Sequence, residues 1–452
     1  MYHFDNDYDV IVVGGGTTGC FAAIAASETG AKVLLVEKLP FLGGNMTGGL
    51  PWLGFHDKAS HRQVVGGLPM RLIRELQKTG GATDFIFDPI TGSAVGVNGA
   101  MLKLTIEKMV IDAGVDVLLH SLVTGHSMKE GKHCLSIAAK GGCLKAGALV
   151  VIDCTDSGDL AELAGAELTV GREPDHRRQV SSYVEIFGGI DFAEMLDYFK
   201  GRPDQIRPFR LSEEQQCALV QQMETAPVWV LGAFAEIIAQ AKKDGIPYDR
   251  TQLIGVAYPC SNELMLVASR VEDVNLNDAA EFTAAEINGL QQTWGILSLL
   301  REYIPGCKNA RLVSTGAQLG IRESRHVKGD HVLTADEMLE PVHFEDAVCC
   351  GAYHMDIHTP DHKGLESRQP PVYTIPYGSL IVAGAENVLV AGRCFSGTHE
   401  AMSSTRVAPI AGAQGEAVGV AAAIAVKSRK SVRDISIKAL QDALIARDVI
   451  IS

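Results

Sequence analysis

A glycine-rich turn close to the N-terminus constrains the fold more than any other feature of this sequence. A short apolar run, Val10–Val13, leads into Gly-Gly-Gly-Thr-Thr-Gly at positions 14–19, and an alanine-rich segment follows. A second apolar run, Val33–Val36, ends in Glu37. The spacing G-x-G-x-x-G between a predicted strand and a predicted helix, with an acid roughly 20 residues further on, matches the dinucleotide-binding fingerprint. The sequence therefore predicts a Rossmann-like βαβ unit that binds an adenine dinucleotide.

The residues of this fingerprint have separate physical roles. Gly14 makes the sharp turn, Gly16 has no Cβ and lets a pyrophosphate approach the backbone, and Gly19 lets the helix pack closely. The free N–H groups and partial positive charge at the helix N-terminus favour phosphate. We expect Glu37 to accept hydrogen bonds from ribose hydroxyls and to repel a 2′-phosphate, which disfavours NADP. The predicted cofactor shell also contains Thr18 and Lys38.

The composition is typical of a globular protein with more than one domain. The chain has 452 residues, 46% of them hydrophobic and 21% charged. The net charge is −14 and no basic block is present, which argues against nucleic acid as a partner. We identify no secretory signal, and the apolar stretch at 417–426 is short for a membrane span. Ten cysteines without CxxC or metal-like spacing indicate free thiols, a cytoplasmic location and no metal site.

A second glycine-rich loop, Gly-Gly-Asn-Met-Thr-Gly-Gly at 43–49, follows Glu37 closely. Such a loop brings backbone N–H groups close to a flat ligand and its phosphates. Together with the fingerprint, it resembles FAD-dependent oxidoreductases, the large group that includes fumarate reductase and succinate dehydrogenase flavoproteins. The resemblance implies FAD, not NAD, in this site, and a loop that runs along the pyrophosphate towards the flavin ring. The loop residues it implicates are Gly44, Asn45, Met46 and Thr47.

Several later segments extend the resemblance. Residues 148–166 resemble a strand followed by D-A-T-G-D-G-D, but Asp156 and Ser157 stand where Gly and Asp are usual. Residues 315–334 and 351–358 resemble the G-I-R-E-[ST]-R and G-G-Y-x-x-D-I-H segments of a bacterial FAD-dependent oxidoreductase family. The resemblance implies further cofactor contacts from Val123, Thr155, Gly392, Arg393, Gln414 and Gly415, the last two near the start of a helix predicted at 409–426.

These segments predict an α/β protein with two domains. Residues 1–166 and 351–452 are expected to form a Rossmann-like FAD-binding domain, and residues 167–350 an inserted α+β domain that holds substrate and caps the flavin. Amphipathic periodicity predicts helices over 66–79 and 100–113. We expect a β-meander over 121–148 and a loop over 80–99.

Four side chains are candidates for the chemistry: Arg322, His358, His399 and Arg406. The arginine fork suits a carboxylate or an anionic oxygen, and histidine can donate or accept a proton. For Arg322 and the neighbouring Arg325, the alternative is a structural network with Glu323, and His358 has a structural alternative as well. His354 and His358 lie four apart, but we expect an extended segment without a third ligand, so we predict no metal there.

The predicted function is that of an FAD-dependent oxidoreductase. Its hydride transfer would run between flavin N5 and a small polar organic substrate, either a carboxylate or a sugar-like polyol. Two alternatives are a non-redox flavoenzyme (isomerase or hydratase) that uses FAD structurally, and a non-catalytic nucleotide-binding scaffold. The direction, the electron partner and homo-oligomer formation are left open. No second G-x-G-x-x-G follows an interior strand, which disfavours a built-in NADH domain.

Overall fold

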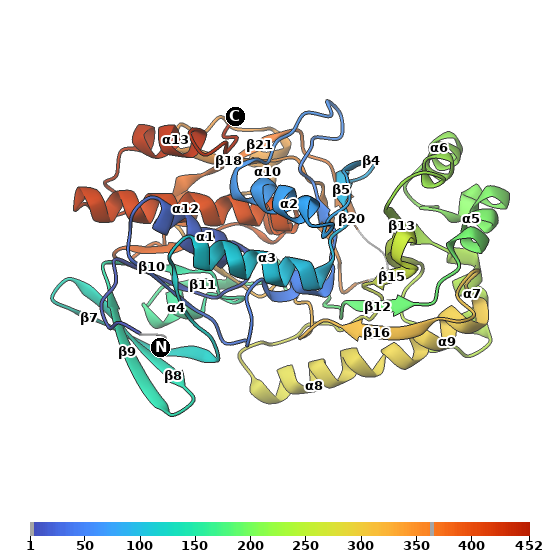
Figure 1. Ribbon diagram of the computed structural model, residues 1–452, viewed down its shortest axis with the longest axis horizontal. Helices are drawn as coiled ribbons and strands as arrows, with labels where there is room; N and C mark the ends of the chain where they lie inside the picture. Colours follow the sequence, from blue (N-terminus) through green and yellow to red (C-terminus); the bar gives the residue numbers. More distant parts are fainter. Residues whose placement is uncertain (1–3, 362–365) are drawn as a thin grey trace.

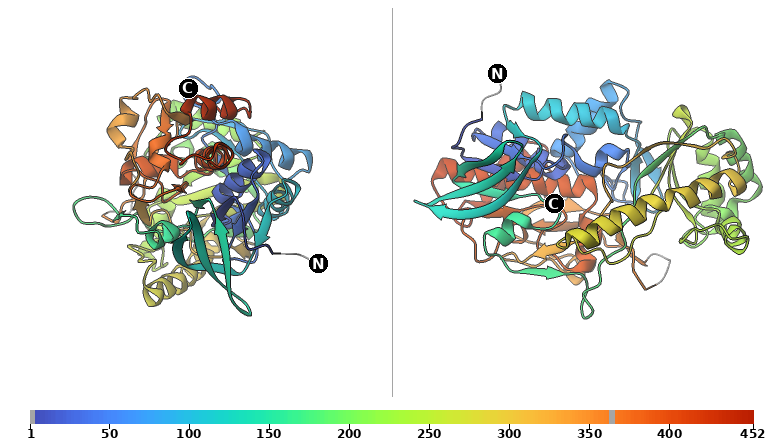
Figure 2. Two further views of the ribbon diagram at one scale, coloured as in Figure 1. Left: turned by 90° about the vertical axis from the view of Figure 1, so that its left-hand side faces the viewer. Right: turned by 90° about the horizontal axis from the view of Figure 1, so that it is seen from below.

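The computed structural model describes residues 4–361 and 366–452. It has two main sheets, which lie towards opposite ends of the long axis (Figure 1). The first and last parts of the chain build one end and the middle part builds the other (Figure 2).

The first sheet is parallel, with the strand order β22-β10-β1-β2-β6. In that order the strands are Val388–Val390, Val150–Asp153, Val10–Val13, Val33–Val36 and Asp116–Leu118. The first four are completely buried and apolar except for Asp153 at the end of β10, as expected for a parallel sheet covered on both faces. β1 pairs with β2 on one side and β10 on the other. The predicted Rossmann-like α/β core is therefore confirmed.

Two helices of small residues cover this sheet. α1 (Thr17–Glu28) connects β1 to β2, and α12 (Ala408–Ser428) packs along it (Figure 1). The contact depends on glycine: a Cβ at Gly415 would lie 2.3 Å from the carbonyl oxygen of Thr18. A Cβ at Gly419 would lie 2.2 Å from that of Ala22. α12 is long and apolar enough to cross a membrane, but 89% of its most apolar window is buried inside the protein, as in a core helix.

The flanking elements agree with the sequence expectations except at one place. α2 (Gly67–Lys78), α3 (Gly99–Asp112) and the meander β7–β9 lie where they were predicted. The meander strands are Ser121–Lys129, Lys132–Ala139 and Gly142–Ala148. The loop expected over 80–99 is wrong, since β4 (Ile86–Asp88) and β5 (Gly92–Val95) pair there and β3 (Trp52–Leu53) joins them. Asp88 closes the turn by accepting the N–H groups of Ile90 and Thr91, and strands this short show no clear periodicity.

The second sheet is antiparallel and has the order β13-β14-β15-β12-β16. Its strands are Trp229–Ala233, Leu253–Tyr258, Glu263–Leu266, Glu185–Gly188 and Arg311–Thr315. The helices of this part are α5 (Phe192–Gly201), α6 (Glu213–Met223), α7 (Ala235–Lys243), α8 (Ala279–Gln291) and α9 (Thr293–Tyr303). Residues of α5, α6, α7 and α9 form a core with one face of β13, β14 and β15. The other face is turned to a cavity described below.

Smaller pairs and helices complete the fold. Their bounds are α4 (Asp159–Leu163), β11 (Leu168–Val170) with β17 (Arg325–Val327), α10 (Ala335–Leu339), β18 (Ala347–Gly351) with β21 (Tyr373–Pro376), β19 (Met355–Ile357) with β20 (Glu366–Arg368), α11 (His399–Thr405) and α13 (Ile437–Ile445). Buried side chains from 327–350 pack with the cores around the first sheet. The domain limits at 166/167 and 350/351 remain a prediction.

Candidate active site

A cavity opens at the carboxyl ends of β1, β2 and β10, the usual place for a ligand in an open parallel sheet. We call it the strand-end cavity. Twelve predicted cofactor residues line it: Gly14, Gly16, Thr18, Glu37, Lys38, Gly44, Asn45, Met46, Val123, Thr155, Gly392 and Arg393. These residues come from segments spread along the chain, and the fold brings them to one place.

The glycine turn has the geometry that the fingerprint requires. Gly14 has φ +100°, and a Cβ there would lie 2.3 Å from the carbonyl oxygen of Cys154. A Cβ at Gly19 would lie 1.8 Å from the carbonyl oxygen of Gly14. At Gly16, by contrast, a Cβ would meet no heavy atom within 4 Å, and no side chain caps α1. Gly16 and the helix N-terminus therefore present open backbone to the cavity, which fits a pyrophosphate.

Glu37 stabilises the backbone on both sides of this site through hydrogen bonds to its carboxylate. Its carboxylate is buried and accepts hydrogen bonds from the Gly15 N–H at 2.5 Å and the Leu39 N–H at 2.7 Å. Burial raises the pKa of the Glu37 carboxyl. The side chain still lines the cavity, so the predicted contact with a ribose remains open to it.

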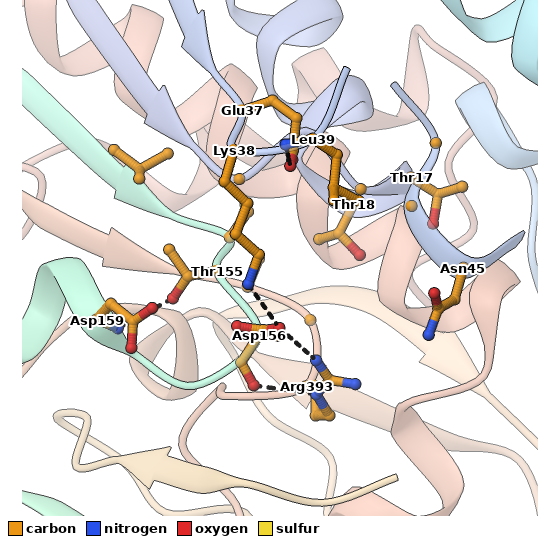
Figure 3. A pocket seen from close by; sticks show the side chains of 18 of the residues that line it. Thr17, Thr18, Glu37, Lys38, Leu39, Asn45, Thr155, Asp156, Asp159 and Arg393 are labelled. Atoms are coloured by element: carbon orange, nitrogen blue, oxygen red, sulfur yellow. Dashed lines mark hydrogen bonds and ion pairs between the residues drawn. The ribbon is translucent and has the colours of Figure 1, made fainter. Parts of the chain in front are cut away.

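Two cations share one acid in the strand-end cavity (Figure 3). Lys38 Nζ lies 3.1 Å from Asp156 Oδ2, and Arg393 Nη2 lies 3.8 Å from the same oxygen. Although burial alone would raise it, Lys38 and Arg393 hold the pKa of Asp156 below its usual value. In the sequence, Asp156 was noted only as a departure from the family pattern. Its negative charge, in a chain with Lys38 and Arg393 as predicted cofactor residues, was the available signal that it could pair with them.

Four predicted cofactor residues lie outside the cavity lining. Thr47 donates to the Gly44 carbonyl at 2.7 Å within the 3₁₀ turn Gly44–Gly48. Gln414 Oε1 accepts the Gly392 N–H at 3.0 Å. Gly19 and Gly415 are needed for backbone contacts with Gly14 and Thr18. Since their groups are used inside the protein, these residues shape the walls and do not face the ligand space.

Two features at the far end of this cavity fit a flavin. Ala408 and Ala411, in the first turn of α12, line the cavity, and no side chain caps that helix. Asn45 Nδ2 donates to the Leu319 carbonyl at 3.3 Å, whereas the buried Asn45 Oδ1 has no hydrogen-bond partner in the described part of the chain. A helix N-terminus and an unused amide oxygen suit a ligand that offers both negative charge and N–H donors.

A second cavity of about 310 Å³ adjoins the first. The two share Met46, Arg406 and Ala408, and the second lies against β13, β14 and β15, so we call it the sheet-face cavity. Three predicted catalytic residues line it: Arg322, His358 and Arg406. Further polar residues that we did not predict as catalytic also line it: Thr91, Arg207, Arg210, Gln252, His354 and Asp356.

The two arginines of the G-I-R-E-S-R segment have different surroundings. Arg322 lines the sheet-face cavity, where Nη1 donates to the Val180 carbonyl at 2.7 Å and the Ser182 hydroxyl at 2.8 Å. Arg325 lines neither cavity and pairs with Asp159 at 3.0 Å and Glu162 at 2.8 Å. Arg325 therefore has a structural role, although its partners are Asp159 and Glu162 and not Glu323 as the alternative expected, whereas Arg322 faces the cavity.

His399 lies away from both cavities, in contrast to its predicted catalytic position. Its Nδ1 is 2.8 Å from each oxygen of Glu323, and that carboxylate also contacts His326 Nε2 at 2.9 Å. All three side chains are buried. Glu323 thus belongs to a structural network whose other members are His326 and His399, and Arg322 is not part of it.

Asp356 is the centre of a polar cluster in the sheet-face cavity. Its Oδ2 lies 3.1 Å from His358 Nε2 and 3.2 Å from Arg406 Nη2, and its Oδ1 lies 3.6 Å from His354 Nε2. Burial, and next the charge of Arg322, lower the pKa of His358 to about 3, so the imidazole is neutral at pH 7. The alternation 354, 356, 358 in an extended segment, which places three side chains on one face, could have indicated this cluster.

Several donors in this cluster have no partner. Arg406 Nε, Arg210 Nη2 and His354 Nδ1 are buried without a hydrogen bond to any described residue. Buried polar atoms are normally paired, so unpaired ones around a single cavity indicate a ligand. No group of three His, Cys, Asp or Glu side chains within 4–361 and 366–452 is arranged to hold a metal ion.

Comparison with known proteins gives short sequence matches and wide structural ones. A ferredoxin–NADP reductase of Lactiplantibacillus plantarum is 38% identical over 22% of this chain and 29% of its own length. A fumarate reductase (cytochrome) of Shewanella frigidimarina is 60% identical over 8% of this chain and 6% of its own length. The chain thus spans less than a third of these relatives.

Among solved structures, glycine oxidase from Geobacillus kaustophilus is 13% identical with a TM-score of 0.43, and the match covers 94% of this chain and 96% of the other. p-Nitrophenol 4-monooxygenase from Pseudomonas putida is 9% identical with a TM-score of 0.47, over 98% and 84% of the two chains. The model of one family, described as FAD dependent oxidoreductase, matches residues 9–444. Because this match covers nearly the whole chain, the protein belongs to the FAD dependent oxidoreductase family and is an enzyme whose cofactor is FAD.

Proposed function

We propose that this oxidoreductase transfers a hydride between flavin N5 and an organic carboxylate bound in the sheet-face cavity. One observation carries the proposal: two of the four guanidinium groups that line this cavity have no carboxylate partner in the described chain. Arg207 pairs with Asp88 at 2.5 Å and Arg406 with Asp356 at 3.2 Å. Arg210 and Arg322 make no such pair, and an anionic substrate would supply one.

FAD, when bound, supplies the group that accepts or returns the hydride. In our proposal, the residues of the strand-end cavity would hold FAD, and Met46, Arg406 and Ala408, which line both cavities, would be next to its ring. Gly16 and the start of α1 would hold the pyrophosphate, with Lys38 and Arg393 beside it. The partial positive charge at the start of α12 would stabilise negative charge on the reduced ring.

Arg322 and Arg210 bind and orient the substrate carboxylate in this mechanism. His358 handles the proton: its Nε2–H donates to Asp356, which leaves a lone pair on Nδ1 to accept a proton from the substrate. Asp356 then stabilises the imidazolium, as a buried carboxylate can. Arg406, which lines both cavities, stabilises negative charge where they meet.

An anaerobic screen of the holoenzyme tests this proposal. Hydroxy- and amino-carboxylates are added one by one, each with its uncharged amide and with a polyol of the same length, and flavin bleaching is followed near 450 nm. We expect bleaching by at least one carboxylate and by none of the matched amides or polyols. Bleaching by polyols alone would overturn the carboxylate assignment. Product formed without bleaching would favour the isomerase or hydratase alternative, whereas family membership does not support a non-catalytic scaffold.

We also propose a cytoplasmic location, because all ten cysteines are free thiols in the structure. The electron donor or acceptor is proposed to be external, since the chain has one dinucleotide fingerprint. We propose neither nucleic acid nor membrane as a partner.

A further inference from the structure

The sheet beneath the second cavity has two chemically similar faces with different neighbours. Along β13, the side chains of Trp229, Leu231 and Ala233 enter the helical core. The alternate residues Val230 and Gly232 line the sheet-face cavity. Since successive side chains of a strand point to opposite faces, the cavity is lined by one face of β13, β14 and β15 and not by a single loop.

This cavity face is apolar. Val230 pairs with Val256, which in turn pairs with Met265, and these three line the cavity together with Ile254 and Val267. Val230, Ile254 and Val267 are half-buried, whereas Val256 and Met265 are buried. No side chain of the three strands that lines the cavity offers a hydrogen bond, within the part of the chain that the structure describes.

The polar groups of the cavity come from other segments. Arg322, His354, Asp356, His358 and Arg406 lie outside the second sheet, as do Thr91, Arg207 and Arg210. Gln252, which directly precedes β14, is the polar side chain next to the sheet among the described lining residues. The cavity therefore combines a cationic cluster with an apolar sheet. A ligand that fills it has a charged end and a body that packs mainly on apolar side chains, because a buried hydroxyl placed against Val230, Val256 or Met265 would lack a partner, which is costly.

We infer that the substrate is a carboxylate with a hydrocarbon body, alkyl or aryl, and not a sugar acid or polyol. The inference rests on the proposed function, since it assumes that the carboxylate lies on Arg322 and Arg210. The body then packs on Val230, Ile254 and Val267. Gly232, which pairs with Ile254, has no side chain on this face, and the end of the body would lie beside it. A Cβ at Gly232 would lie 3.0 Å from Gln252 Oε1, so this end of the cavity is bordered by one amide group.

Calorimetric titration of the holoenzyme with three six-carbon probes tests this inference. Hexanoate has the charge and the apolar body, gluconate has the charge and a hydroxylated body, and hexanamide has the body without the charge. We expect hexanoate to bind at least about tenfold more tightly than either of the others. Equal or tighter binding of gluconate would overturn the hydrocarbon body but leave the carboxylate in place. Equal or tighter binding of hexanamide, or no binding of either carboxylate, would overturn the proposed function itself.

Matched substitutions on the same sheet give an independent test. Val230→Thr keeps the side-chain shape but adds a hydroxyl to the cavity wall, and we expect hexanoate to bind about three- to tenfold more weakly. The control is Val313→Thr on β16, where the side chain is 43% exposed and outside the cavity, and binding should not change. Gly232→Val should shorten the longest alkyl carboxylate that binds, because the new side chain occupies space in the cavity. The fold should tolerate this change, since the nearest neighbours would be the flexible side chains of Gln252 and Arg207. Equal effects of the two threonine variants, or an unchanged length limit in Gly232→Val, would overturn the inference.

Discussion

The two adjoining cavities are built in different ways. The strand-end cavity is made largely of backbone, at glycine turns and helix N-termini that short stretches of sequence specify. The sheet-face cavity is made of side chains from segments that are far apart in the chain. Each wall of the proposed cofactor site is therefore specified by a short local motif, although the fold must bring these motifs together. The proposed substrate site depends on single side chains from distant segments.

The cavities also differ in charge. In the strand-end cavity, Asp156 offsets Lys38 and Arg393, so the pyrophosphate depends on N–H groups and helix termini more than on net charge. In the sheet-face cavity, Arg210 and Arg322 lack acidic partners among the described residues, so charge itself is available for recognition. The following predictions test this contrast, beginning with the largest expected effect.

Gly16→Val should weaken FAD binding by about 100-fold or more, because the side chain would occupy the space expected for the pyrophosphate. The apoprotein should keep its melting temperature, since Gly16 has φ −63° and open space around a Cβ. Flavin-to-protein ratio and thermal unfolding measure the two effects. As a control, Gly19→Val should unfold the protein, because a Cβ there meets the Gly14 carbonyl. A fully occupied yellow Gly16→Val protein would show that the pyrophosphate lies elsewhere.

Arg322→Gln should lower turnover by about 100-fold and leave FAD bound, because it removes a charged contact to substrate and no cofactor contact. Turnover and flavin content are measured on the same preparation. Its matched control is Arg325→Gln, which breaks pairs with Asp159 and Glu162 and should lower the melting temperature without changing turnover per folded enzyme. Loss of flavin from Arg322→Gln would move this residue into the cofactor site.

The pH dependence should report on His358. Because its pKa is lowered to about 3, the imidazole stays unprotonated well below pH 6.5, and kcat/KM should fall only as the pH approaches about 3. Between the two pKa values the unfolded chain binds the extra proton, so stability decreases as the pH is lowered from about 6.5. His358→Gln should make this decrease shallower in melting curves. An acid limb near pH 6.5 that disappears in His358→Gln would contradict the lowered pKa of His358, and a limb that this variant leaves unchanged would contradict its assignment as the base.

Lys38→Met should have the smallest effect, weakening FAD binding by a few fold. The Lys38 side chain is 41% exposed and shares Asp156 with Arg393, and exposed ion pairs contribute little. Fluorescence titration of apoprotein with FAD measures it. The control is Lys32→Met, a 47% exposed lysine that pairs with Asp5 outside the cavity and should leave FAD binding unchanged. A loss as large as that of Gly16→Val would mean that charge, not backbone, dominates the cofactor site.

The sequence predicted the parallel sheet, its crossover helix and most of the strand-end lining, because each depends on a contiguous motif. Gln414, Gly415 and Thr47 were placed too close to the ligand, since proximity in sequence does not show which way a side chain points. His399 was assigned to the chemistry since its buried partner, Glu323, could not be recognised from the sequence, because the two residues are 76 positions apart in the chain. Arg210 and the apolar face of β13–β15 gave no sequence signal, because their role depends on pairing across the second sheet.

The packing of α12 on α1 has a consequence for how the enzyme acquires its flavin during synthesis. β10 lacks its pairing partner until β22 is synthesised, which is more than 230 residues further along the chain. Likewise, α1 lacks its packing partner until the glycine face of α12 is synthesised. Gly392, Arg393 and Ala408 are also part of the strand-end cavity. A nascent chain therefore carries the fingerprint long before the strand-end cavity is complete, and we expect it to retain FAD only after the C-terminal segments have left the ribosome. Until then, an open strand edge and a bare helix face are exposed to the chaperones that meet the emerging chain.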